Sequence, residues 1–155
     1  MKNHIILTLT ALFVCSTLLQ AQKIDIEPLS GENTLVRISA SQQTRYLLLP
    51  IEEKAPEAVV KIICGNELAR SLNVRLALDK VDYFVPLDLQ EWKGEDIELL
   101  VRLFVDRTNG RDAQSEICWS KMTLSESFDK ENREMFRPSY HHTPEYAWMN
   151  DPNGM

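Results

Sequence analysis

The sequence has little of what small proteins use to bind metals or to cross-link a fold. Its 155 residues contain 3 His, 3 Cys and 5 Gly. Two of the histidines, His141 and His142, are adjacent, and neighbouring residues of a strand point to opposite faces, so they make a poor pair of metal ligands. The chain has a net charge of −6 and no stripe of basic residues, which argues against nucleic-acid binding. We therefore expect no metal site, no cofactor and no nucleic-acid partner.

Beyond residue 21 the chain also lacks an apolar run that could span a membrane. The first 21 residues differ, because the mostly apolar stretch Ile5–Leu19 follows the basic Lys2 and leads to the small residue Ala21. This arrangement predicts a signal peptide over residues 1–21, and hence export to the periplasm, the cell surface or the medium. Lipidation of Cys15 is the alternative, and it ranks lower because Val14 is large for the residue before a lipidated cysteine.

Two cysteines, Cys64 and Cys118, remain after residue 21, and two positions carry no spacing signature. Export would permit a disulfide between them. The alternative is a pair of buried thiols, each within an apolar strand. We favour the thiols, because free cysteine is among the most buried residue types.

Between residues 22 and 122 the hydrophobic pattern is that of short β-strands. In the clearest stretch, Ile97–Asp106, apolar residues alternate with polar ones such as Glu98 and Arg102, which is the period of a strand with one buried face. We see no helical stretch among the strands, so the pattern predicts an all-β fold, an antiparallel β-sandwich. The predicted strands are Lys23–Glu27, Thr34–Ala40, Arg45–Ile51, Val59–Cys64, Ser71–Leu78, Val81–Leu87, Ile97–Asp106 and Gln114–Met122.

Turn residues separate these strands. Asn109-Gly110 is typical of a tight hairpin, because both residues tolerate positive φ. Gly65-Asn66 and Asp79-Lys80 indicate two further reversals, and Glu52–Pro56 reads as a polar loop.

The composition changes after residue 122. Residues 123–135 are polar and charged and read as a linker or a short helix that Pro138 ends. Residues 136–155 are rich in aromatic side chains that have no partner strands in this chain. We expect residues 136–155 to be the start of a second, truncated domain.

The segment Asn150–Gly154 carries the one carboxylate in a setting suited to sugar chemistry. Read alone, it is a turn, since Pro152 fixes φ and Gly154 permits positive φ. A carboxylate at Asp151, held rigidly beside the aromatic Trp148, could attack an anomeric carbon while the ring stacks on a sugar. An ordinary surface turn is the alternative.

The longer string that contains this turn resembles the opening of the catalytic domain in glycoside hydrolase family 32, the invertases, inulinases and levanases. It comprises Arg137-Pro138, Tyr140-His141, Thr143-Pro144 and Trp148-Met149-Asn150-Asp151-Pro152-Asn153-Gly154. In that family the last segment lies on the first strand of a five-bladed β-propeller. The preceding part resembles a module of unassigned function found before such domains. Its marks are residues 45–51 (RYLLLPI) and 79–87 (DKVDYFVPL).

The resemblance implies a retaining β-fructofuranosidase that acts on fructans or sucrose through a covalent fructosyl-enzyme. Asp151 would be the catalytic nucleophile, and Trp148, Met149 and Asn150 would line the substrate-binding site. The family also uses an acid/base Glu and an Arg-Asp-Pro segment that lie later in the sequence. This chain has no Arg-Asp-Pro, since Ala113 follows Arg111-Asp112, so we expect the 155 residues alone to be inactive.

The rival hypothesis is a non-catalytic module that binds carbohydrate or serves as a spacer. Two tryptophans of the sandwich bear on it. Trp119 lies in an apolar stretch and is expected in the core, whereas Trp92 lies in the loop 90–94 and is the better candidate for a sugar platform.

Overall fold

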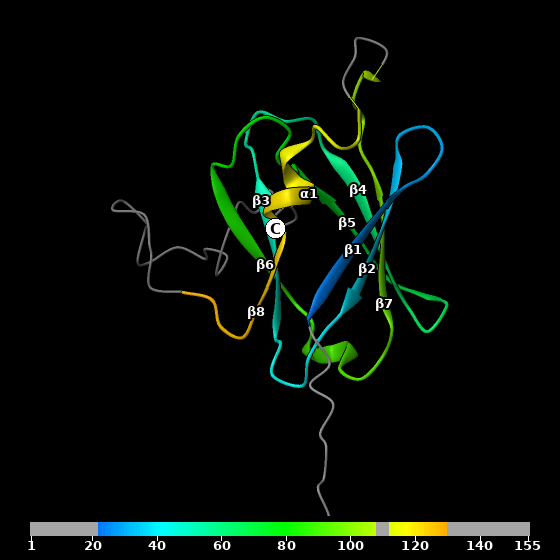
Figure 1. Ribbon diagram of the computed structural model, residues 1–155, viewed down its shortest axis with the longest axis vertical. Helices are drawn as coiled ribbons and strands as arrows, with labels where there is room; N and C mark the ends of the chain where they lie inside the picture. Colours follow the sequence, from blue (N-terminus) through cyan, green and yellow to red (C-terminus); the bar gives the residue numbers. More distant parts are fainter. Residues whose placement is uncertain (1–21, 108–111, 130–155) are drawn as a thin grey trace, which may run out of the picture.

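The computed structural model describes residues 22–107 and 112–129, and in these ranges the chain is nearly all β (Figure 1). Two antiparallel sheets face each other as a sandwich, so the predicted fold class is confirmed for this part of the chain. The predicted signal peptide over 1–21, residues 130–135 of the predicted linker and the expected propeller strand in 136–155 lie outside the described residues.

The larger sheet has five strands in the order β1-β2-β7-β4-β5. Each neighbouring pair is antiparallel, and β7 joins the β1–β2 hairpin to the β4–β5 hairpin. The strands are β1 (Lys23–Pro28), β2 (Asn33–Ser39), β4 (Ala58–Cys64), β5 (Glu67–Val74) and β7 (Ile97–Arg102).

The smaller sheet has three strands in the order β6-β3-β8. Its central strand is β3 (Tyr46–Ile51), flanked by β6 (Tyr83–Asp88) and by the short β8 (Thr123–Ser125). Two short helices complete the described structure, the 3₁₀-helix η1 (Gln90–Trp92) and the α-helix α1 (Ile117–Lys121). In Figure 1, α1 lies beside β3, between the two sheets.

The core lies between the two sheets, and β7 illustrates how alternating apolar residues contribute to it. The alternate apolar residues of the predicted stretch Ile97–Asp106 are buried, with Leu99 and Val101 fully enclosed and Val105 9% exposed. The ladder ends at Arg102, after which the amide of Leu103 donates to the carbonyl of Glu32 at 3.1 Å. The alternation predicted for this stretch is therefore confirmed, although the paired strand is shorter.

Two of the predicted reversals are confirmed. Gly65 and Asn66 have φ of 55° and 72° and connect β4 to β5, as a hairpin turn with two left-handed residues requires. Asp79-Lys80 lies in the connection between β5 and β6. The reversal at Asn109-Gly110 lies outside the described residues.

The prediction of a strand over Gln114–Met122 is wrong. Asp112 caps a turn there, with its side chain accepting from the amides of Gln114 and Ser115, and α1 follows over Ile117–Lys121. One turn of helix lets Cys118, Trp119 and Met122 all reach the core, which the two-residue period of a strand would not allow.

Two further boundaries differ from prediction. Residues 123–125, expected in a linker or helix, form β8, which pairs with Tyr46–Leu48 of β3. The strand predicted over Ser71–Leu78 is instead β5, over Glu67–Val74. Leu76 and Leu78 continue the apolar alternation but leave the sheet, and they are buried in a segment whose carbonyls accept hydrogen bonds from α1.

Candidate functional site

The predicted catalytic segment lies outside the described residues. This holds for the nucleophile Asp151 and for Trp148, Met149 and Asn150, as well as for His141 and His142. Their roles stay predictions. The described sandwich can nevertheless be searched for carboxylates, aromatic platforms and thiols that could do chemistry or bind a ligand.

The most enclosed charge of the described structure is Glu116, just before α1. Its side chain is 0% exposed and accepts from Arg107 Nε at 3.0 Å, Arg107 Nη2 at 3.1 Å and Trp119 Nε1 at 2.8 Å. Arg107 also donates from Nη1 to the carbonyl of Gly31 at 2.7 Å. The sequence pattern did not single out this cluster, because its residue types are common and because Glu116 and Trp119 lie in a stretch that was predicted to be a strand.

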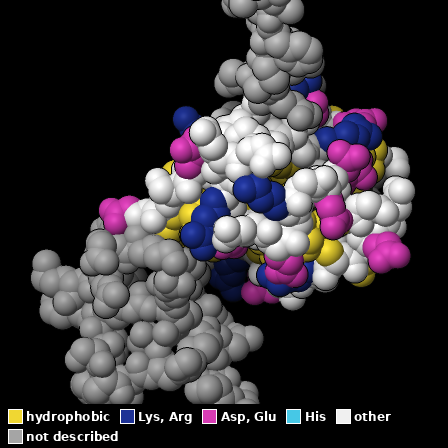
Figure 2. All heavy atoms as spheres, turned by 90° about the horizontal axis from the view of Figure 1, so that it is seen from below, with side chains coloured by type: hydrophobic (Ala, Val, Ile, Leu, Met, Phe, Trp, Pro, Cys, Tyr) yellow, Lys and Arg dark blue, Asp and Glu magenta, His cyan; other side chains and the backbone are white. Residues whose placement is uncertain are grey.

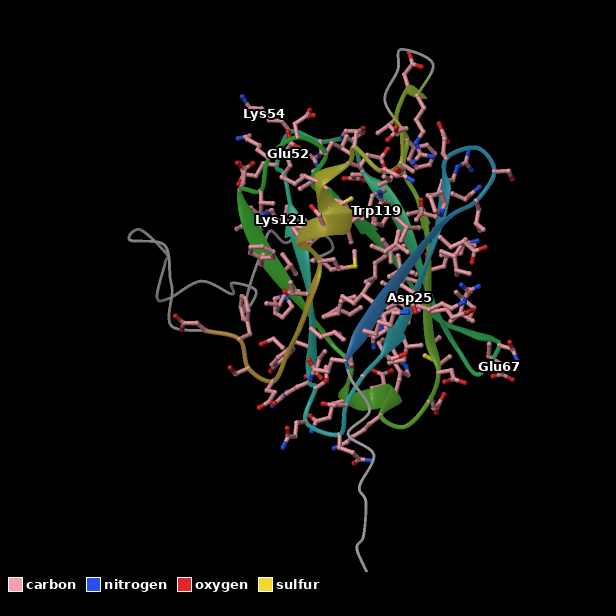
Figure 3. The ribbon with its side chains drawn as sticks, in the orientation of Figure 1. Asp25, Glu52, Lys54, Glu67, Trp119 and Lys121 are labelled. Atoms are coloured by element: carbon pink, nitrogen blue, oxygen red, sulfur yellow. The ribbon has the colours of Figure 1, made fainter. Side chains whose placement is uncertain are left out.

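This arrangement fixes α1 against the five-stranded sheet. Glu116 precedes the helix, Trp119 lies within it, and Arg107 reaches the β1–β2 turn. Figure 3 shows Trp119 on α1. Bidentate Arg–carboxylate pairs are strong and geometrically specific. Since both carboxylate oxygens of Glu116 have donors within the protein, we assign this cluster a structural role rather than a role as catalytic acid.

A second carboxylate, Glu52, is held by backbone amides in the loop after β3. It accepts from the amides of Leu78 at 2.9 Å, Asp79 at 3.0 Å and Lys80 at 3.5 Å. The backbone hydrogen bond from Asp79 is the largest of the causes that lower the pKa of Glu52, and those from Leu78 and Lys80 add to it. A carboxylate stabilised in its charged form and occupied by its own chain is a loop anchor, not a proton donor. Figure 3 shows Glu52 and Lys54 at this end of the molecule.

An open groove lies next to Arg107. It has a volume of about 620 Å³ and is lined by Gly31, Glu32, Phe104, Val105, Asp106 and Arg107. Phe104 is 45% exposed, and the guanidinium of Arg102 lies 4.8 Å from its ring centre. An exposed aromatic ring beside carboxylates has the chemistry of a sugar-binding surface, although Arg102 occupies one side of the ring.

The prediction of Trp92 as a sugar platform is wrong. Its side chain is 5% exposed and belongs to the core cluster, because the turn of η1 folds it beneath the sheets. Arg70 covers its ring at 5.3 Å. Trp119 is in the core, as predicted, but it lies on α1 rather than on a strand.

The two cysteines are buried free thiols, as favoured from the sequence. Burial raises the pKa of Cys118 to about 12 and also raises that of Cys64. Because the thiolate is the reactive form, neither side chain is suited to nucleophilic chemistry. Cys118 lies on α1 and not, as expected, in a strand.

Acidic and basic side chains alternate over the surface of the sandwich that Figure 2 shows, without a field of one sign. Within residues 22–107 and 112–129, no three His, Cys, Asp or Glu side chains gather where they could hold a metal ion. In the same ranges no helix is long and apolar enough to cross a membrane.

Comparison with known proteins gives two matches. The profile of DUF4980, described as a domain of unknown function, matches residues 30–140. A stretch of 40 residues is 45% identical to "Putative glycosyl hydrolase ecdE" of Aspergillus rugulosus, and it covers 25% of this chain and 6% of that protein. The match thus spans only a small part of the length of this curated relative. No solved structure matches the chain.

Proposed function

The chain belongs to the DUF4980 family, a domain of unknown function, and from this premise we propose that it is the N-terminal part of an exported retaining β-fructosidase of glycoside hydrolase family 32. The observation that carries the proposal is the heptapeptide Trp148–Gly154, which has the form of that family's nucleophile segment without departure. The stretch shared with a protein named as a glycosyl hydrolase supports the broader class.

Asp151 attacks the anomeric carbon of a β-fructofuranoside, and the bond to the leaving oxygen breaks. In retaining enzymes the nucleophile and the acid lie about 5–5.5 Å apart, so that a covalent fructosyl ester forms and water then releases fructose. Trp148, Met149 and Asn150 form the wall of the fructose site and hold Asp151 in line with the reacting carbon. The substrate is a fructan or sucrose, and the reaction needs no cofactor.

The acid that protonates the leaving oxygen is not one of the buried or anchored carboxylates of the sandwich. Glu116 is paired to Arg107 and Trp119, and the pKa of Glu52 is lowered, which is the opposite of what a general acid needs. We assign the acid to a Glu of a later segment of the longer protein, beyond an Arg-Asp-Pro sequence, as the resemblance implies.

The decisive experiment replaces the nucleophile in the protein that carries this chain. Asp151→Ala should abolish release of fructose from levan, inulin or sucrose, and added azide should restore turnover by taking the place of the carboxylate and yielding a fructosyl azide. The matched control is Asp25→Ala, since Asp25 is an exposed, ion-paired aspartate of β1 and should leave turnover unchanged. Wild-type turnover in the Asp151→Ala protein would overturn the proposal.

A non-catalytic sugar-binding role for the sandwich is the second candidate, and the groove beside Phe104 is the observation that favours it. If the groove binds fructan, Phe104→Ala should weaken retention of the protein on immobilised levan or inulin. Phe84→Ala removes an exposed phenylalanine elsewhere in the fold, 37% exposed against 45% for Phe104, and serves as the control. Equal retention of both variants would dismiss this role for the groove.

A further inference from the structure

Helix α1 receives its N-terminal hydrogen bonds from another segment of the chain. It has only five residues, and its N-cap residue, Glu116, makes no side-chain capping hydrogen bond. Instead, the amide of Ile117 donates to the carbonyl of Leu78 at 3.1 Å. The amide of Cys118 likewise donates to the carbonyl of Ala77 at 2.9 Å. These two carbonyls take the place of a cap, because the first amides of a helix have no partner within it and a helix this short is marginal by itself.

The segment that supplies these carbonyls is itself held by Glu52. One carboxylate oxygen of Glu52, Oε2, accepts from the amides of Leu78, Asp79 and Lys80 at 2.9, 3.0 and 3.5 Å. Leu78 therefore joins the carboxylate to the helix, because its amide donates to Glu52 and its carbonyl accepts from Ile117. Hydrogen bonds in such a chain polarise one another, so loss of the first weakens the second.

Backbone hydrogen bonds also tie the loop that carries Glu52 to this segment. The amide of Glu52 donates to the carbonyl of Arg75 at 3.0 Å. The amide of Ala77 donates to the carbonyl of Pro50 at 2.9 Å. Residues 75–80 are therefore positioned by the end of β3 and the loop after it, and α1 is in turn positioned by residues 75–80.

The structure around α1 has fewer backbone pairings than the five-stranded sheet. Strand β8, which follows the helix, pairs with β3 over three residues. Strand β7 instead pairs over six residues with each of its two neighbours. Segments with few buried contacts and hydrogen bonds open at lower free energy than the central strands of a fold. This difference allows α1 to open while β7 stays paired.

We propose that residues 75–80, α1 and β8 form a local unit that opens as one piece, with the carboxylate of Glu52 as its latch. The closed unit buries three side chains of α1 and of the residue after it, Cys118, Trp119 and Met122. Without the carboxylate, three amides of residues 75–80 lose their acceptor, and the carbonyls that cap α1 are held less firmly. Glu52 thus acts on α1 through the backbone of Leu78. The inference does not depend on the proposed function.

Hydrogen exchange of the intact chain tests whether the unit opens by itself. The amides of Ile117 and Cys118 should exchange faster than those of β7. Low concentrations of urea should accelerate the exchange of these two amides less than that of β7, because a local opening exposes less surface than global unfolding does. Equal exchange of both sets of amides, with equal dependence on urea, would overturn the proposal.

Replacement of the latch tests the role of Glu52. Glu52→Gln should speed exchange of the two α1 amides about tenfold, because hydrogen bonds to a charged acceptor contribute more than those between neutral groups. Glu53→Gln is the matched control, since it makes the same change of charge in an exposed neighbour, whereas all three amides bond to Glu52. The amides of β7 should remain the slower set in both variants, which shows that the sandwich stays folded. Unchanged exchange in Glu52→Gln, or equal acceleration in Glu53→Gln, would contradict the latch.

The thiol of Cys118 distinguishes opening of the unit from fraying of the helix end. Its side chain is fully buried on α1, so a maleimide reaches it only when the helix leaves the core. Glu52→Gln should accelerate labelling of Cys118 by the same factor as exchange of the α1 amides, as measured by mass analysis of the labelled peptide. Faster amide exchange without faster labelling would overturn the proposal, because only the start of the helix would then have loosened.

Discussion

The two sheets of the sandwich share one core but differ on their outer faces. The solvent-exposed face of the five-stranded sheet carries a network of ion pairs, in which Arg37 of β2 pairs with Glu27 of β1 and Glu98 of β7. The outer face of the three-stranded sheet combines Leu48, Phe84 and Pro86 with Asp88, Thr123 and Ser125, and Asp88 is ion-paired to Arg45. The comparison teaches that the all-β fold class does not by itself reveal how charged and apolar side chains are divided between the two outer faces.

The largest effects should come from leucines that face the core, in either sheet. Leu99→Ala on β7 and Leu49→Ala on β3 should each lower the free energy of unfolding by about 2–5 kcal/mol, because both side chains are almost fully buried. Their neighbours sharpen the comparison. Leu100→Ala, on the outer face of the five-stranded sheet, should cost less than about 1 kcal/mol. Leu48→Ala, on the outer face of the three-stranded sheet, should cost more than Leu100→Ala does, because Leu48 lies between the buried residues Tyr46 and Pro50. Urea unfolding of the four variants measures this, and equal costs for Leu48 and Leu100 would remove the distinction between the faces.

The next effect concerns the cluster that holds α1 to the five-stranded sheet. Glu116→Ala leaves the guanidinium of Arg107 without its carboxylate and should cost about 3 kcal/mol. Glu98→Ala is the matched control, because it removes an exposed partner of Arg37 and should cost at most about 1 kcal/mol. Thermal or urea unfolding of the two variants measures the difference. Similar losses of stability in both would mean that the buried pair does not hold α1 to the five-stranded sheet.

Acid should destabilise the protein through Glu52, which lies in the loop after β3 of the three-stranded sheet. Its folded-state pKa is lowered from the ordinary value of 4.5, so its contribution to stability is complete above that pH. The contribution declines as the pH falls below 4.5 toward the folded-state pKa, because the unfolded chain takes up the proton first. Glu52→Gln should therefore be less stable than wild type at pH 7, with a difference that shrinks in acid. Unfolding curves measured between neutral pH and pH 3 test this, and a constant difference would exclude Glu52 as the cause.

The smallest effect should come from the ion pairs of the charged outer face. Arg37→Met should change the free energy of unfolding by less than about 1 kcal/mol. Salt should reduce this change in the free energy of unfolding further, since exposed charges are screened over about 10 Å at 0.1 M ionic strength. The measurement is urea unfolding at low and high salt. A large, salt-independent loss would show that the network on this face is a structural element rather than a solvated surface.

Most of the strands could be predicted because one buried face leaves a two-residue period in the sequence. That period predicted the first residue of β7, Ile97, correctly. It could not locate the end of β5, because Leu76 and Leu78 keep the alternation after they leave the sheet. It also could not distinguish a single helical turn from a short strand, which is why α1 was predicted as a strand.

Side-chain environment was harder to predict than secondary structure. Trp92 looked accessible in a loop, yet η1 turns it into the core, and no local pattern encodes that turn. The continuous apolar run of β3 is typical of a strand that is covered on both faces, and Tyr46 and Pro50 on its outer side are buried. The catalytic role predicted for Asp151 rests on a resemblance to a family, and its segment lies outside the described residues.

The position of β7 in the five-stranded sheet has a consequence for how the molecule forms. The hairpins β1–β2 and β4–β5 are local and can close early, but each finds its neighbour in the sheet only when β7 enters between them. Pairings between segments so far apart in sequence are slow, because the intervening chain must first be ordered. Folding should therefore be limited by the arrival of residues 97–102. A chain cut between β5 and β7 would leave two hairpins with open edges, prone to pair with other molecules.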